Sequence, residues 1–126
     1  MIRASCFADT NRSAFTNGSH SGFADVPLKK GGNGNGFGPH ELLEAALATC
    51  MTITVSKYAE QHQLPMLNVE CEVTADRSVS DVVTLQYSLK LDGELSLEQE
   101  QRLRQAAVKC PVAKTLTGII AFKPLE

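Results

Sequence analysis

The sequence predicts a single α+β domain in which short strands, a long helix, two further strands, a second helix and a last strand follow in order. Three observations carry this prediction. Turn residues interrupt weakly alternating segments over residues 2–26, and a helix-forming, strongly apolar segment runs from His40 to about Gln63. Two alternating segments then precede a second helical pattern. A chain of 126 residues is the usual size of one domain, so we expect residues 1–126 to form one.

The composition excludes several classes of function. A chain that is 43% hydrophobic and 21% charged is ordinary for a globular protein and unlike a disordered one. The net charge of −2 leaves no basic surplus for a phosphate backbone, so we expect no nucleic-acid partner. No apolar run reaches the ~20 residues of a membrane span, and the first residues lack the order of a signal peptide. We therefore expect no membrane partner and a reducing, cytoplasmic location.

The N-terminal segments predict two or three antiparallel strands, with Asn17-Gly18 as a hairpin turn. The following loop, residues 27–38, holds five of the nine glycines. It lacks the Lys-Ser/Thr pair of a phosphate-binding loop and the third glycine of a dinucleotide fingerprint. We expect a flexible connection there rather than a nucleotide site.

Pro39 is well suited to the first position of the long helix, where its missing N–H has no partner to lose. Between Leu42 and Val55 the helix is apolar on nearly every side, which predicts burial on every side. A domain this small has little material to wrap such a helix. We therefore expect a second subunit to supply part of the covering.

Alternation of apolar and polar residues predicts strands over 69–75 and 83–91, and Asp92-Gly93 forms the exit turn. Ser96 and Gln99 have the spacing of a capping box, which begins a helix that runs through residue 109. Its apolar stripe consists of Leu103, Ala106, Ala107 and Cys110.

Cys110 precedes a proline, which disfavours the helical conformation at Cys110, while Pro111 can begin a fresh helical turn. These preferences place Cys110 at a helix junction, in a position like that of an N-cap. Residues 118–122 then predict a closing strand.

The histidines His20, His40 and His62 lie about twenty residues apart, and no cysteine pair has metal-ligand spacing. We therefore expect neither a metal ion nor another cofactor.

The four cysteines have different surroundings. Cys6 and Cys71 fall on the inward side of predicted strands, which favours a packing role for both. Cys50 lies in the apolar helix, where composition alone favours burial. For Cys110 two interpretations stay open: a buried thiol, or a thiol made acidic by the helix start and two nearby lysines, Lys109 and Lys114.

Two segments carry a resemblance to a known family. Residues 38–50, GPHELLEAALATC, resemble the Gly-Pro-x-Glu-Leu-Leu-x-Ala-Ala-Leu-x-x-Cys segment of the OsmC/Ohr proteins, which are named for osmotic induction and organic-hydroperoxide resistance. Residues 108–116, VKCPVAKTL, are similar to that family's second cysteine segment. The Gly-rich loop, the length and the order of elements agree, so the resemblance covers nearly the whole chain.

The resemblance implies an OsmC-like fold in an intertwined homodimer that acts as a thiol peroxidase. By position, Cys50 would be the peroxidatic cysteine and Cys110 the resolving one. Cys50 would reduce an organic hydroperoxide and become a sulfenic acid, and Cys110 would condense with it to form a disulfide. An external dithiol, lipoyl or a small thiol, would then reduce the disulfide.

The resemblance also implies an arginine near the reactive thiol, held by a glutamate at the start of the helix. By position Arg12 is the candidate, with Arg3 behind it, although Arg12 is equally compatible with a surface turn. The sequence departs from the organic-hydroperoxide branch after Pro39, because His40 occupies the position of the branch's glutamate and Glu41 follows it. A histidine holds arginine less well than a carboxylate does, which puts peroxidase efficiency in question.

Helix geometry bears on which subunit these residues serve. Nine residues separate Glu41 from Cys50, which is about 13 Å along the axis and places the two on opposite faces. We therefore expect Glu41 or His40 to serve the site of the partner subunit.

Three hypotheses for the function follow. The first is a dithiol-dependent peroxidase acting on organic hydroperoxides. The second is a thiol-disulfide redox protein or regulator with weak peroxidase activity. The third is a non-enzymatic dimeric module that binds a hydrophobic small molecule, and it predicts that function survives loss of both Cys50 and Cys110.

Overall fold

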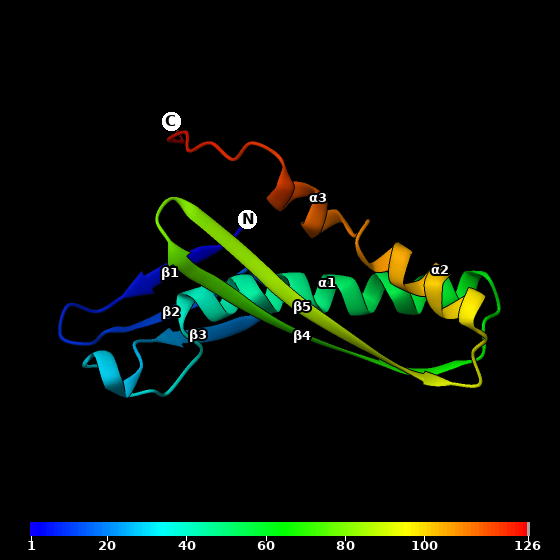
Figure 1. Ribbon diagram of the computed structural model, residues 1–126. Helices are drawn as coiled ribbons and strands as arrows, with labels where there is room; N and C mark the ends of the chain where they lie inside the picture. The colour runs from blue at the N-terminus through cyan, green and yellow to red at the C-terminus, as the bar shows by residue number, and fades with distance from the viewer. Residues whose placement is uncertain (126) are drawn as a thin grey trace. The chain divides into compact units, whose positions relative to one another are not determined.

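The computed structural model (Figure 1) describes residues 1–125. They form two compact units that divide between Leu43 and Glu44. The order of elements confirms the predicted α+β class. The elements are β1 (Arg3–Cys6), β2 (Arg12–Thr16), β3 (Ser21–Asp25), the 3₁₀ helix η1 (Leu28–Lys30), α1 (Pro39–Gln61), β4 (Met66–Val79), β5 (Val82–Gly93), α2 (Leu97–Ala107) and α3 (Pro111–Thr117).

The N-terminal unit is built on an antiparallel sheet of order β1-β2-β3. The turn between β2 and β3 is the predicted hairpin at Asn17-Gly18. The Asn17 Oδ1 accepts hydrogen bonds from the backbone N–H groups of Ser19 and His20, at 2.9 and 2.7 Å. Gly18 adopts a φ of 97°, which favours glycine.

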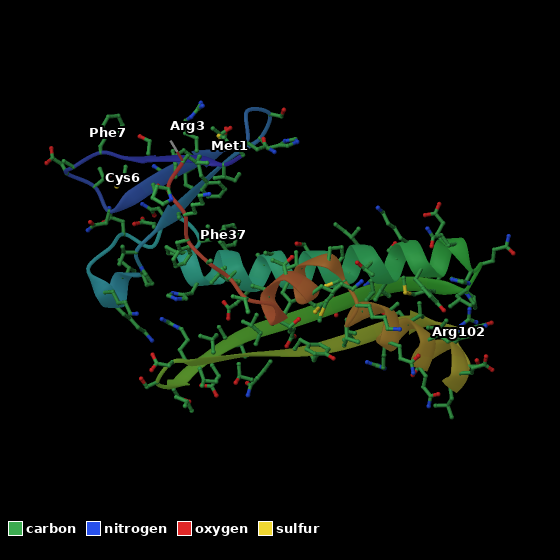
Figure 2. All side chains as sticks on the ribbon, turned by 90° about the horizontal axis from the view of Figure 1, so that it is seen from above. Met1, Arg3, Cys6, Phe7, Phe37 and Arg102 are labelled. Atoms are coloured by element: carbon green, nitrogen blue, oxygen red, sulfur yellow. The ribbon has the colours of Figure 1, made fainter. Side chains whose placement is uncertain are left out.

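Burial of Cys6 is a wrong prediction. Every residue of β1 is exposed, because β1 is an edge strand of this sheet. Figure 2 shows Cys6 near the end of β1, beside Phe7, whose side chain is also exposed. The Cys6 thiol contacts the carbonyl oxygen of Thr10 at 3.3 Å.

A buried carboxylate holds the Gly-rich loop to the end of β3. Asp25 is only 3% exposed, and its two oxygens accept from the N–H groups of Val26 and Asn35, at 2.7 and 3.0 Å. The Asp25 N–H donates to the carbonyl oxygen of Phe37 at 3.0 Å. Gly32 is required by close approach, because a Cβ there would overlap the Val26 carbonyl oxygen.

The second unit is built on a two-stranded antiparallel ribbon, β4 with β5, in which Cys71 pairs with Leu89. Both predicted strands are confirmed, and each extends beyond the alternating segment, 69–75 or 83–91, that predicted it. Apolar residues of the ribbon pack against one stripe of α1, formed by Leu47, Met51, Val55 and Ala59.

The prediction that α1 is buried on every side is wrong for a single chain. Its buried residues recur every four positions, whereas Ile53 between them is 56% exposed. A ribbon of two strands covers only one side of a helix, which explains the difference. Within residues 1–125, no helix is both long and apolar enough to cross a membrane.

The capping box of α2 is confirmed. The Ser96 hydroxyl accepts from the Gln99 N–H at 3.1 Å, and the Gln99 side chain accepts from the Ser96 N–H at 3.0 Å. The predicted stripe then buries Leu103 and Ala107 completely against the α1 core.

The predicted closing strand over residues 118–122 is wrong. This segment follows α3 as irregular chain, with Ile119 and Phe122 almost fully exposed. A strand needs a neighbour, and among residues 1–125 this segment is paired with none.

We expect Asp25→Asn to lower the free energy of unfolding by about 1–3 kcal/mol, because an amide offers one acceptor where two backbone donors now bind a carboxylate. Urea unfolding at one fixed protein concentration measures this. Asp9→Asn, at an exposed position, is the matched control and should change little. Equal effects of the two substitutions would contradict the structural role of Asp25.

Candidate active site

The second unit brings together the two cysteines that the motifs single out. Cys50 lies in the middle of α1, and its sulfur accepts a hydrogen bond from the first turn of α3, which directly follows Cys110, sixty residues later in the chain. Both are free thiols. Cys110 is completely buried in the core, whereas Cys50 is partly exposed at its rim.

The start of α3 positions both sulfur atoms. Cys110 is extended, with φ −63° and ψ 150°, as expected of a residue before proline, and it is the N-cap of α3 with Pro111 at the first position. The predicted N-cap position is therefore confirmed. Cys110 Sγ accepts from the Ala113 N–H at 3.4 Å, and Cys50 Sγ accepts from the Val112 N–H at 3.5 Å. Two amides of one helical turn thus point at the two thiols.

Burial decides the acidity of Cys110. Desolvation raises the pKa of the Cys110 thiol, and this effect outweighs the N–H of Ala113, which acts to lower the pKa. The neighbouring Cys50 raises the pKa of Cys110 further. The interpretation of Cys110 as an acidic thiol at a helix start is therefore wrong, and the buried interpretation is confirmed.

Cys71 lies close to this pair but on the ribbon side of the core. Its thiol contacts Met51 Sδ at 3.8 Å, and its side chain is partly buried against the core cluster. Burial, followed by the nearby Cys110 and Glu72, raises the pKa of the Cys71 thiol. This environment matches the packing role predicted for Cys71.

A groove of about 700 Å³ runs along α1 and reaches Cys50. Around Cys50 its walls are mainly apolar, whereas polar side chains follow about two helical turns further along. A hydrophobic molecule in this groove could present a reactive end to Cys50. The residues that line it are Ala46, Thr49, Cys50, Ile53, Thr54, Lys57, Tyr58, Gln61, Pro111 and Val112.

The remaining candidate residues lie in the N-terminal unit. Arg12 begins β2, and its guanidinium lies 3.8 Å from the centre of the Phe23 ring. Glu41 accepts from the Gly38 N–H at 2.8 Å, which ties it to the start of α1. His40, in the same turn, is exposed. Within this unit Arg12 and Glu41 are therefore engaged with different partners. The alternative candidate, Arg3, is exposed on β1.

The sequence reasoning missed a side-chain cluster around Tyr58, which is one of the residues of the groove wall. Arg102, labelled in Figure 2, lies on α2. Its Nε donates to the Tyr58 hydroxyl at 3.1 Å, and its guanidinium lies 5.6 Å from the Tyr58 ring centre. The Tyr58 ring also contacts His62, with ring centres 4.1 Å apart. The four-residue spacing of Tyr58 and His62 at the end of the predicted helix was a usable signal. Arg102 gave none, because it is 44 residues from Tyr58.

Acidic, histidine and cysteine side chains do not form a cluster of three or more placed for a metal ion anywhere in residues 1–125.

The fold and the site define an α+β protein with a facing pair of cysteines at the edge of its helical core. Residues 32–124 match the family model described as OsmC-like protein, and the chain belongs to this family.

Solved structures of similar fold agree with this membership. An OsmC-like protein from Mycoplasma pneumoniae is 21% identical with a TM-score of 0.76, over 94% of this chain and 87% of that one. An organic hydroperoxide resistance protein from Legionella pneumophila, also named as a predicted redox protein, is 19% identical with a TM-score of 0.68, over 94% and 88%. The organic hydroperoxide resistance protein of Bacillus subtilis is 21% identical with a TM-score of 0.62, over 94% and 90%. At these identities the similarity shows the fold alone. A comparison with curated protein sequences finds no significant match.

We expect Cys110 to resist alkylation by iodoacetamide in the native protein at pH 8, because burial excludes the reagent and holds the thiol pKa above its usual ~8.5. Cys6, which is exposed, is the internal control and should be modified first. Peptide mapping by mass spectrometry measures both rates. Modification of Cys110 as fast as Cys6 would contradict its buried, protonated state.

Proposed function

We propose that this chain is a thiol-dependent peroxidase that reduces organic hydroperoxides through a two-cysteine cycle. The observation that carries the proposal is the pairing of a groove-facing Cys50 with a buried neighbour, Cys110. Two relatives of the same fold are named for organic hydroperoxide resistance, which supports this substrate class. The reducing cytoplasm is the compartment in which such a dithiol cycle would operate.

In the first step the Cys50 thiolate attacks the terminal oxygen of the hydroperoxide. A sulfur–oxygen bond forms, the oxygen–oxygen bond breaks, and the alkoxide takes a proton and leaves as the alcohol. The Val112 N–H, 3.5 Å from Cys50 Sγ, is placed to stabilise the thiolate. The groove walls near Cys50 are mainly apolar, which favours an organic peroxide over hydrogen peroxide.

In the second step the Cys110 sulfur attacks the sulfenic sulfur of Cys50. A disulfide forms, and the hydroxyl group leaves as water with the proton that Cys110 loses. The raised pKa of Cys110 keeps it protonated until this step, so Cys110 does not compete for the peroxide. An external dithiol, lipoyl or a small thiol, supplies two electrons and two protons to restore both thiols.

The working unit is a homodimer in this proposal. Large apolar side chains are exposed on α1 and in the C-terminal segment, including Ile53, Ile119 and Phe122. A second copy that covers such side chains would remove the cost of their exposure to water.

Arg12, with Glu41 or His40 as its anchor, serves the cysteine site of the second copy in this proposal. A thiolate in an apolar groove needs a compensating cation, and the guanidinium is a permanent one. Arg12 is the first residue of β2, and Glu41 lies in the first turn of α1.

We expect Cys50→Ser to abolish turnover of cumene hydroperoxide, because the attacking sulfur is lost. We expect Cys110→Ser to complete one turnover and to retain a sulfenic acid on Cys50, because no thiol resolves it. Peroxide consumption, with and without a lipoyl donor, and mass spectrometry measure these outcomes. Hydrogen peroxide is the comparison substrate.

Cys71→Ser is the matched control for these variants, since Cys71 contacts Met51 rather than the groove. It should retain repeated turnover. A sulfenic acid on Cys110 in place of Cys50 would reverse the two roles. Full activity in a chain that lacks both Cys50 and Cys110 would favour the non-enzymatic binding module.

A mixture of two inactive variants tests the shared site. In a dimer of Cys50→Ser with Arg12→Ala, one site has an intact cysteine from one copy and an intact arginine from the other. Refolding the two together should restore about a quarter of wild-type activity, because half of the dimers are mixed and each has one complete site. The same mixture would stay inactive if Arg12 served the cysteine of its own copy. A monomeric mass by light scattering would contradict the dimer itself.

A further inference from the structure

An asparagine followed by a glycine occurs at three places in the N-terminal unit: Asn17-Gly18, Asn33-Gly34 and Asn35-Gly36. In such a pair the glycine nitrogen can attack the carbonyl carbon of the asparagine side chain, because glycine has no Cβ to hinder the approach. The side-chain nitrogen leaves as ammonia, and a succinimide ring forms. Water then opens the ring to give aspartate or isoaspartate. The reaction therefore needs a glycine nitrogen that is free to move.

Hydrogen bonds restrain the attacking nitrogen in two of the three pairs. The Gly18 N–H donates to Thr16 Oγ1 at 3.0 Å, and Asn17 Oδ1 accepts from two further backbone N–H groups. The Gly34 N–H donates to the carbonyl oxygen of Val26 at 3.2 Å. In both pairs at least one hydrogen bond must break before the ring can close.

The third pair, Asn35-Gly36, lacks this restraint. Both of its residues are exposed. Among residues 1–125, no group accepts a hydrogen bond from the Gly36 N–H. Ring closure at Asn35 therefore does not require the loss of a hydrogen bond from the attacking nitrogen.

The bond between Asn35 and Gly36 lies between two contacts that hold the Gly-rich loop to Asp25. Before it, the Asn35 N–H donates to Asp25 Oδ2 at 3.0 Å, and after it, the Phe37 carbonyl oxygen accepts from the Asp25 N–H at 3.0 Å. Isoaspartate would add one carbon to the backbone between these contacts, so both could not keep their present geometry. Either product would also add a negative charge at the residue that binds the Asp25 carboxylate. Asp25 is only 3% exposed, and like charges repel most strongly where water is excluded.

We propose that Asn35 is a deamidation site and that its conversion releases the Gly-rich loop from Asp25 as the protein ages. The conversion consumes water, releases ammonia and adds one negative charge, and no electron is gained or lost. All the groups that take part lie in the N-terminal unit, so the inference does not depend on the proposed peroxidase cycle.

The test incubates the intact protein in mildly alkaline buffer and follows the three pairs by peptide mapping, with fragmentation that distinguishes aspartate from isoaspartate. We expect conversion at Asn35 to be at least about five-fold faster than at Asn17 or Asn33, the factor that one hydrogen bond of typical net strength gives. In denaturant the three rates should come close together, because the hydrogen bonds that distinguish the pairs are lost. Equal rates in the native protein, or faster conversion at Asn17 or Asn33, would overturn the proposal.

A second measurement tests the release of the loop. Converted protein, separated by its added charge on an ion exchanger, should be cut by trypsin at Lys29 and Lys30 about five-fold faster than unconverted protein, because both lysines are exposed in this loop and one hydrogen bond fewer holds it. Asn35→Gln should show no such increase during incubation, because the larger ring that glutamine must form closes much more slowly. Asn33→Gln is the matched control and should convert at Asn35 like the wild type. Converted protein that is cut at the unconverted rate would overturn the release of the loop.

Discussion

The contact between the first turn of α3 and the middle of α1 is the constraint on which the site depends. Pro111 begins α3 and holds Cys110 in an extended conformation, so the N–H groups of Val112 and Ala113 point toward two sulfur atoms. The same turn places one thiol in the core and leaves the other at a groove. Two cysteines sixty residues apart thereby gain different exposure to solvent, which is the basis of the different roles that we propose for them.

Desolvation, rather than the helix start, determines the state of Cys110. An N-terminal amide lowers the pKa of a thiol that remains in water, but Cys110 is completely buried, and burial penalises the thiolate more than one long hydrogen bond favours it. Cys50 receives a similar amide without complete burial. This difference in burial suits the proposed cycle, in which Cys50 reacts with the peroxide and Cys110 reacts with the resulting sulfenic acid.

Local patterns predicted the features that depend on neighbouring residues. Three such features were predicted correctly: the hairpin at Asn17-Gly18, the capping box at Ser96 and the N-cap at Cys110. Each is determined by hydrogen bonds or backbone preferences among about four consecutive residues. The family motifs identified the cysteine pair, and the structure brings these two thiols together.

Features that depend on distant segments were predicted poorly. Alternation placed Cys6 inward, but burial requires a covering layer, and β1 is an exposed edge strand. Residues 118–122 have strand-forming side chains, yet a strand forms only where a partner supplies hydrogen bonds. Arg102 reaches Tyr58 from another helix, and no sequence period connects them. Ile53 and Phe122 are apolar side chains that a single chain leaves exposed. In the proposed homodimer, the second copy would cover such side chains.

The most direct test of the two-thiol account is to oxidise the wild-type protein with one equivalent of cumene hydroperoxide and map its disulfides without reduction. The account predicts one molecule of alcohol for each intrachain Cys50–Cys110 disulfide, with Cys6 and Cys71 left as free thiols. A disulfide that includes Cys6 or Cys71 in place of Cys50 would contradict it, as would consumption of the peroxide without any disulfide.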